Sequence, residues 1–132
     1  MMEKIFQKNF WPIVYKKTRS LGEHLIAEFW GVKIEEDMAK IEKILIEAAK
    51  KTGSTPLEVV SHKFSPKGFS AMILLAESHI ALHYWPENEY LAVDIFTCGK
   101  DSDPQKGLEY LKEQFQPKKM EVQRINRGKV LS

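Results

Sequence analysis

Residues 64–99 carry side chains that can perform nucleophilic and acid–base chemistry at short spacing. They include Glu-Ser-His at positions 77–79, an isolated His83, Trp-Pro-Glu at positions 85–87 and the single cysteine, Cys98. A serine hydroxyl attacks once strain or a base activates it, an imidazole exchanges protons at neutral pH, and a thiol can donate a proton. The segment therefore supplies an attacking group, a base and an acid.

Common catalytic motifs do not account for this segment. Ser78 lacks the Gly-x-Ser-x-Gly surroundings of a nucleophile elbow, and no glycine-rich phosphate loop is present. His79 and His83 have the spacing of two metal ligands on a helix, but the composition around them is that of a strand, so we predict no metal site. Taken singly, these side chains are more often structural, and we interpret His24, His62 and His79 in that way.

The bulk composition indicates one compact domain. The chain has 132 residues, 43% hydrophobic, with 20 basic and 18 acidic residues. A net charge of +2 does not suggest a nucleic-acid footprint, and no apolar run is long enough for a membrane span. One cysteine permits no disulfide framework, and residues 1–20 lack the pattern of a secretory signal. We therefore expect a cytoplasmic protein that binds neither nucleic acid nor membrane.

The hydrophobic pattern predicts alternating elements after an N-terminal extension of residues 1–20. Residues 22–32 alternate as a strand does, and residues 35–51 have helical spacing, with Gly53 placed to end the helix. Asp103-Pro104 is a start signal for a second helix. Further strands are expected at residues 57–64, 69–77, 79–85, 90–98 and 119–126.

This order predicts an α+β fold, a two-layer sandwich in which an antiparallel sheet carries both helices on one face. Residues 21–132 form the single domain. The strands offer more apolar surface than two helices can cover, so we expect a second protomer to bury the other face in a larger αββα-type assembly. The residues counted toward that excess are Leu25, Met72, Leu74, Val93 and Ile95.

Four sequence blocks carry a resemblance to a known family: GEHLIAEFWG, HKFSPKGFS, AESHIALHYWPE and AVDIFTCG. Together they resemble the bacterial and archaeal S-adenosylmethionine decarboxylases, over about residues 20–128. Phe69 stands where that family usually has a small aliphatic residue, and Tyr84 where it commonly has threonine or serine. No functional position of the family pattern is missing.

The resemblance implies that the chain cuts its own backbone between Glu77 and Ser78. Ser78 would attack the carbonyl carbon of Glu77, and the amide would become an ester by an N-to-O acyl shift. Elimination of that ester and hydrolysis of the resulting dehydroalanine would leave a pyruvoyl group, the cofactor, at the start of residues 78–132. The family pattern makes Ser70 a hydrogen-bond partner of the cyclic intermediate and His83 the base for elimination.

The resemblance also implies the roles of four further residues. Cys98 would return a proton to the substrate α-carbon after CO2 leaves. Phe64 and Trp85 are aromatic candidates for an adenine pocket, and Glu87 would accept hydrogen bonds from ribose hydroxyls. The expected substrate is S-adenosylmethionine, for polyamine synthesis, and the expected unit is a homodimer of cleaved protomers.

Two alternatives stay open from the sequence. The first is a pyruvoyl-dependent decarboxylase of arginine or another amino acid, because some archaeal relatives act on arginine. The second is a non-catalytic homologue that regulates an active partner, although Ser78, His83 and Cys98 are all present. In an intact precursor we expect residues 77 and 78 to lie in a tight turn between two strands, with Ser70 and His83 near that turn.

Overall fold

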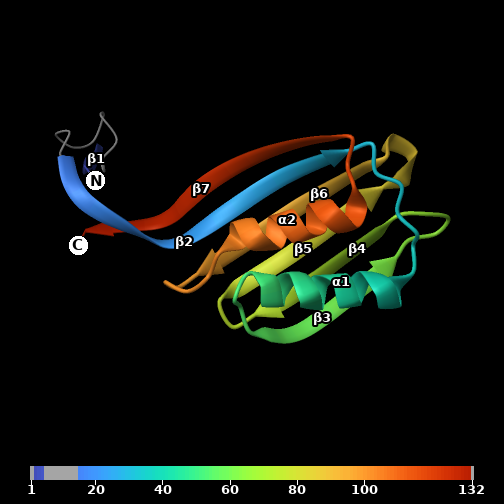
Figure 1. The fold of residues 1–132 in the computed structure, drawn as a ribbon, viewed down its shortest axis with the longest axis horizontal. Coiled ribbons are helices and arrows are strands. Elements are labelled where there is room, and N and C mark those ends of the chain that lie inside the picture. Colours follow the sequence, from blue (N-terminus) through green and yellow to red (C-terminus); the bar gives the residue numbers. More distant parts are fainter. Residues whose placement is uncertain (1, 5–14, 132) are drawn as a thin grey trace.

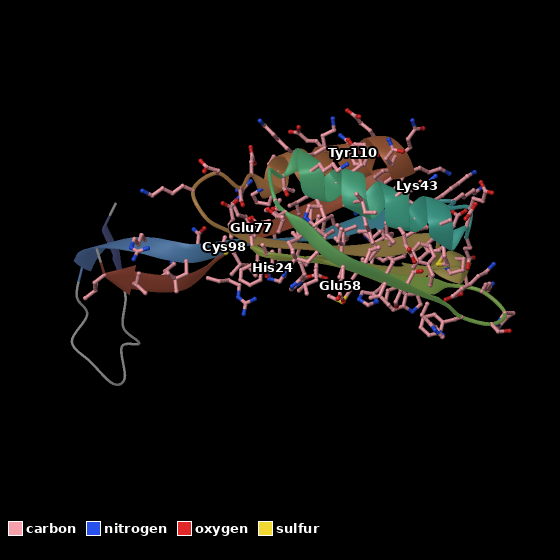
Figure 2. The ribbon with its side chains drawn as sticks, turned by 90° about the horizontal axis from the view of Figure 1, so that it is seen from below. His24, Lys43, Glu58, Glu77, Cys98 and Tyr110 are labelled. Atoms are coloured by element: carbon pink, nitrogen blue, oxygen red, sulfur yellow. The ribbon has the colours of Figure 1, made fainter. Side chains whose placement is uncertain are left out.

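The computed structural model describes residues 2–4 and 15–131. Its antiparallel sheet has the order β7-β2-β6-β5-β4-β3, and β1 pairs with the first residues of β2. Both helices lie on one face of this sheet (Figures 1 and 2), which confirms the predicted two-layer α+β fold. The strands are β1 (Met2–Lys4), β2 (Tyr15–Trp30), β3 (Pro56–Lys63), β4 (Phe69–Leu75), β5 (Ser78–Trp85), β6 (Tyr90–Cys98) and β7 (Lys119–Leu131); the helices are α1 (Met38–Lys51) and α2 (Pro104–Phe115), and a 3₁₀ turn spans Pro86–Asn88.

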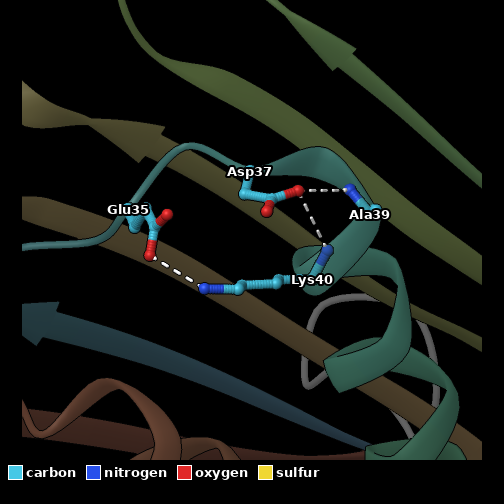
Figure 3. Close-up of polar contacts among 4 residues, drawn as sticks. All are labelled: Glu35, Asp37, Ala39 and Lys40. Carbon is cyan, nitrogen blue, oxygen red and sulfur yellow. Dashed lines mark hydrogen bonds and ion pairs between the residues drawn. The ribbon is translucent and has the colours of Figure 1, made fainter.

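The helices begin and end at the residues whose chemistry favours it. The Asp37 carboxylate accepts hydrogen bonds from the backbone N–H groups of Ala39 and Lys40 at the start of α1 (Figure 3). Gly53, with a φ of 78°, follows its C-cap. Asp103 caps α2 in the same way, and Pro104 occupies its first turn as predicted.

The core lies between the helices and the face of the sheet that they cover. Leu25, Val93 and Ile95 are buried there, on strands paired so that Leu25 lies opposite Ile95. The prediction that these three residues add to the apolar surface that the helices leave uncovered is therefore wrong. Met72 and Leu74 do face the other way and are 38% and 47% exposed. We call this uncovered surface the bare face.

Strands β2 and β7 are longer than the sequence pattern predicts. The strand expected at residue 22 begins at Tyr15, and the strand expected to end at residue 126 continues to Leu131. These outer parts pair with each other, with Thr18 opposite Leu131, and form a ribbon that projects beyond the rest of the sheet (Figure 1). Residues 15–20, assigned to the N-terminal extension, thus belong to β2, while the apolar residues at positions 5–14 lie outside the described part of the chain.

Candidate active site

The proposed cleavage point lies in the tight connection between β4 and β5. Leu75 pairs with Ser78, and Ala76 and Glu77 form the turn between them. Ser78 has a φ of 157°, a conformation that glycine adopts more readily and that costs another residue about 1–3 kcal/mol. The expected tight turn is present, and the peptide between Glu77 and Ser78 is held with backbone strain.

The thiol of Cys98 contacts the carbonyl of this peptide. Its Sγ donates a hydrogen bond of 2.9 Å to the backbone oxygen of Glu77, and the two residues lie side by side at one end of the sheet (Figure 2). Cys98 ends β6 and pairs with Gly22 of β2. A Cβ atom on Gly22 would lie 2.6 Å from the Phe96 ring, so glycine permits this close approach of the strands.

The side chain of Glu77 points in another direction and fixes the turn. Its carboxylate accepts a 2.9 Å hydrogen bond from the backbone N–H of Thr55, in the loop that precedes β3. The carbonyl of Thr55 accepts a 3.0 Å hydrogen bond from the N–H of Ala76. Because two bonds tie the turn to one loop, the carbonyl of Glu77 stays directed at Cys98.

A histidine that the sequence interpretation left as structural lies beside Ser78, the candidate nucleophile. The Nδ1 atom of His79 is 3.5 Å from the Oγ atom of Ser78. Successive residues of a regular strand point to opposite faces, so the pattern gave no reason to bring these two side chains together. The unusual φ of Ser78 interrupts that alternation and could not be foreseen from residue types.

Five of the predicted binding and processing residues surround a second site, at the far end of β5. Ser70 and His83 face each other on neighbouring strands, with 2.7 Å between Oγ and Nδ1. They line a cavity of about 370 Å³ together with Phe64, Trp85 and Glu87. Phe64, Trp85 and Glu87 were expected to share a pocket, whereas Ser70 and His83 were expected beside Ser78 and line this cavity instead.

An aromatic row supports this cavity on the bare face. The Trp85 ring stacks on Tyr90 at 5.5 Å between centroids, and Tyr90 packs against Trp30 at 4.4 Å. The phenol of Tyr90 donates a 2.6 Å hydrogen bond to Glu28. Burial, and then this bond, raise the pKa of Tyr90, so the hydroxyl stays protonated and the row stays uncharged.

Within one chain the two sites are well separated. Ser78 lies opposite Leu75, whereas His83 lies opposite Ser70, five residues further along both strands. At about 3.3 Å per residue, the separation along the sheet is about 16 Å. The expectation that Ser70 and His83 lie near the turn is therefore wrong for a single chain.

Comparison with known proteins shows the family to which the chain belongs. A family model described as S-adenosylmethionine decarboxylase matches residues 23–128. The chain belongs to the S-adenosylmethionine decarboxylase family. The matched range includes every predicted site residue of this family: Phe64, Ser70, Glu77, Ser78, His83, Trp85, Glu87 and Cys98.

Individual relatives cover most of the chain. The S-adenosylmethionine decarboxylase proenzyme of Moorella thermoacetica is 43% identical over 112 residues, which is 83% of this chain and 90% of that protein. The proenzyme of Methanococcus maripaludis strain S2 is 42% identical, over 83% and 92%. The crystal structure of the adenosylmethionine decarboxylase from Aquifex aeolicus is similar with a TM-score of 0.78 and 32% identity, over 86% of this chain and 95% of that one.

Residues 2–4 and 15–131 contain no group of three or more His, Cys, Asp or Glu side chains arranged to hold a metal ion. Neither of the helices in that part of the chain is long and apolar enough to cross a membrane.

Proposed function

We propose that this chain is the precursor of a pyruvoyl enzyme, which cleaves itself between Glu77 and Ser78 and then decarboxylates S-adenosylmethionine. The hydrogen bond from the Cys98 thiol to the Glu77 carbonyl oxygen carries the proposal. A donor in that position polarises the carbonyl and stabilises the negative charge that forms when a nucleophile attacks it. The names of the curated relatives, all proenzymes, support the same conclusion.

The residues at the turn suit self-cleavage. Ser78 Oγ attacks the carbonyl carbon of Glu77, strain in the peptide favours its rearrangement to an ester, and elimination leaves the C-terminal product of residues 78–132. The pyruvoyl group formed from Ser78 supplies the carbonyl that takes up electrons as CO2 leaves. The Sγ atom of Cys98 then lies close to the new N-terminus, where its thiol can return a proton to the substrate carbon.

The second site suits a nucleoside that carries a sulfonium. Phe64 and Trp85 offer aromatic faces to adenine, for which stacking contributes about 1–3 kcal/mol per base. The electron-rich ring faces also attract a sulfonium by cation–π interaction. Glu87 lies in the same cavity and can accept hydrogen bonds from ribose hydroxyls.

A homodimer would unite the two sites. Sheets pack face to face at about 10 Å, so a second bare face can cover the first. If the two-fold axis runs across the strands within the interface, the rotation reverses the strand direction. That operation places the Ser70–His83 end of one chain over the Ser78–Cys98 end of the other, where Ser70 can bond the cleavage intermediate and His83 can remove the α-proton.

Mass spectrometry of the intact protein tests the proposal. The wild-type chain should give two fragments, residues 1–77 and residues 78–132 with a pyruvoyl group in place of Ser78. Ser78→Ala removes the attacking hydroxyl with little loss of volume, so it should remain folded, uncleaved and inactive. Release of CO2 from carboxyl-labelled S-adenosylmethionine, and not from arginine or ornithine, should accompany wild-type cleavage. Cleavage of Ser78→Ala at the same peptide would contradict the proposed origin of the cofactor.

A further inference from the structure

The first step of self-cleavage needs a base for the hydroxyl of Ser78, and one imidazole of the same chain is in place for it. His79 Nδ1 lies 3.5 Å from Ser78 Oγ. The other candidate, His83, is hydrogen-bonded to Ser70 and lies about 16 Å away along the sheet at about 3.3 Å per residue. Contact with the attacking atom within one chain thus favours His79.

Packing fixes the ring of His79 in this position. Its edge meets the ring of His24 at 6.2 Å between centroids and the ring of Phe96 at 5.9 Å. The His24 ring is itself held by a 2.9 Å hydrogen bond to Asp94. A side chain enclosed by two rings loses little rotational freedom when it accepts a proton, which suits a positioned base.

The surroundings also keep His79 uncharged. Burial lowers its pKa most, His24 and Arg127 lower it further, and the Asp94 carboxylate acts in the opposite direction. Arg127 lies over the Phe96 ring, 4.5 Å from its centroid, on the same side of the sheet. A neutral imidazole, with the proton on Nε2, leaves Nδ1 free to accept a proton at neutral pH.

We propose that His79 is the general base, and then the general acid, of the N-to-O acyl shift at Ser78, an inference that rests on the proposed self-cleavage. As Ser78 Oγ bonds to the carbonyl carbon of Glu77, its proton passes to His79 Nδ1, and Cys98 hydrogen-bonds the oxyanion. When the bond from that carbon to the Ser78 nitrogen breaks, the same proton passes from His79 to the nitrogen. The peptide becomes an ester and a free amine with no other reactant.

The assignment divides two proton transfers between two histidines. His79 serves the rearrangement of the amide, and His83 of a second copy serves removal of the α-proton from the ester. The two variants should therefore stop at different chemical species. His79→Asn should remain an amide, whereas His83→Ala should accumulate the ester.

The test follows cleavage of the full chain made by cell-free translation. His79→Asn keeps a polar atom near the Nδ1 position but supplies no base, so cleavage should slow by about a hundredfold or more. Lys43→Asn, at an exposed residue of α1 on the helix side of the sheet, is the control and should cleave at the wild-type rate. The wild-type rate should fall as the pH drops through the lowered pKa of His79, because a protonated imidazole accepts no proton, and the variant should lack that dependence.

Hydroxylamine, which cuts esters and spares amides, identifies the species at which each variant stops. It should release fragments from denatured His83→Ala and none from His79→Asn. Added imidazole should restore cleavage to His79→Ala, which shows that the ring acts chemically and that the variant folds. Two results would overturn the role of His79 and leave the proposed self-cleavage standing. They are cleavage of His79→Asn within threefold of the wild-type rate (about 0.7 kcal/mol) and an ester in that variant. A wild-type chain that never cleaves overturns the proposed function as well.

Discussion

Cys98 lies where each of the two proposed reactions, self-cleavage and decarboxylation, needs a donor. In the uncleaved chain its thiol donates to the Glu77 carbonyl oxygen, and after cleavage the same sulfur would lie beside the new N-terminus. The sequence interpretation assigned it only the second role. A cysteine at the end of a strand gives no information about which backbone oxygen it meets, because that depends on the pairing of β6 with its neighbours and on the position of the turn.

Substitutions of Cys98 should separate the two roles. Cys98→Ala removes the hydrogen-bond donor to the oxyanion, so self-cleavage should slow by about ten- to a hundredfold. The loss should be smaller than for removal of a stronger oxyanion donor, because a thiol is a weak donor. Cys98→Ser restores a hydroxyl donor and should recover most of the cleavage rate. Its fully cleaved product should nevertheless decarboxylate poorly, because a hydroxyl is a weaker acid than a thiol. Gel analysis measures the cleavage rate, and CO2 release measures decarboxylation. If Cys98→Ala and Cys98→Ser lost the same share of the cleavage rate, the donor role of Cys98 in cleavage would be contradicted.

At the residue scale, the sequence supplied a set of candidate side chains but did not predict how they meet. Phe64, Trp85 and Glu87 were expected to share a pocket and do line one cavity, but Ser70 and His83, which were expected beside Ser78, line the same cavity. Their distance from Ser78 was not expected, because it follows from strand register. His79 was missed for a related reason, since strand alternation separates neighbours that an unusual φ brings together.

The elements hold these residues in place through their ends. The segment before α1 is an example, because two consecutive acidic residues there have different tasks. Asp37 caps the helix (Figure 3), while the Glu36 carboxylate accepts a 2.7 Å hydrogen bond from the backbone N–H of Gly68. Gly68 belongs to the loop that lines the cavity with Phe64. The start of α1 therefore anchors one wall of the proposed substrate site.

Substitution of these two residues should distinguish anchoring from helix stability. Glu36→Ala removes the anchor of the 64–68 loop, so KM for S-adenosylmethionine should rise by about five- to tenfold, in line with the net contribution of about 1 kcal/mol from a typical hydrogen bond. Cleavage at residue 77 should continue, since the turn is elsewhere. Glu36→Gln keeps an acceptor and should restore most of the affinity.

Asp37→Ala is the matched control for the helix. Loss of the cap should cost about 1 kcal/mol of stability and lower the melting temperature by a few degrees, with KM unchanged. A large rise in KM for this variant, or none for Glu36→Ala, would contradict the assigned division.

Element boundaries were predictable where a local signal sets them. Asp37, Gly53 and Asp103-Pro104 mark helix ends by their own chemistry, and the structure follows them. The outer ends of β2 and β7 depend on their pairing with each other, from Thr18–Leu131 inward. Such pairing joins residues that are distant in the sequence, so hydrophobic alternation in either strand alone did not predict it.

At the scale of the whole molecule, the bare face joins the two candidate sites. Large apolar side chains are exposed on it, among polar and titratable ones, and in general a contiguous exposed apolar surface marks a site of contact with another molecule. Those on this face are Trp30, Val60, Met72, Leu74, Trp85 and Ile125. The separation of Ser78 from His83 along the same face gives a reason for that contact to be a second copy.

Mixing two inactive variants tests whether each complete site combines two chains. One partner carries Ser78→Ala and the other His83→Ala. In their heterodimer one site is complete: the His83→Ala chain supplies an intact Ser78–Cys98 half, and the Ser78→Ala chain supplies an intact Ser70–His83 half. The other site carries both substitutions. If half of the dimers are mixed and each has one complete site, coexpression should restore about a quarter of wild-type activity. Only the His83→Ala chain should be cleaved, which different tags on the two chains would reveal on a gel.

Coexpressed Ser78→Ala and Cys98→Ala are the matched control, because both substitutions fall in the same half and no pairing yields a complete site. Activity in the control pair, or an inactive test pair whose heterodimers are present, would contradict a site shared between subunits and would require Ser70 and His83 to reach Ser78 within one chain.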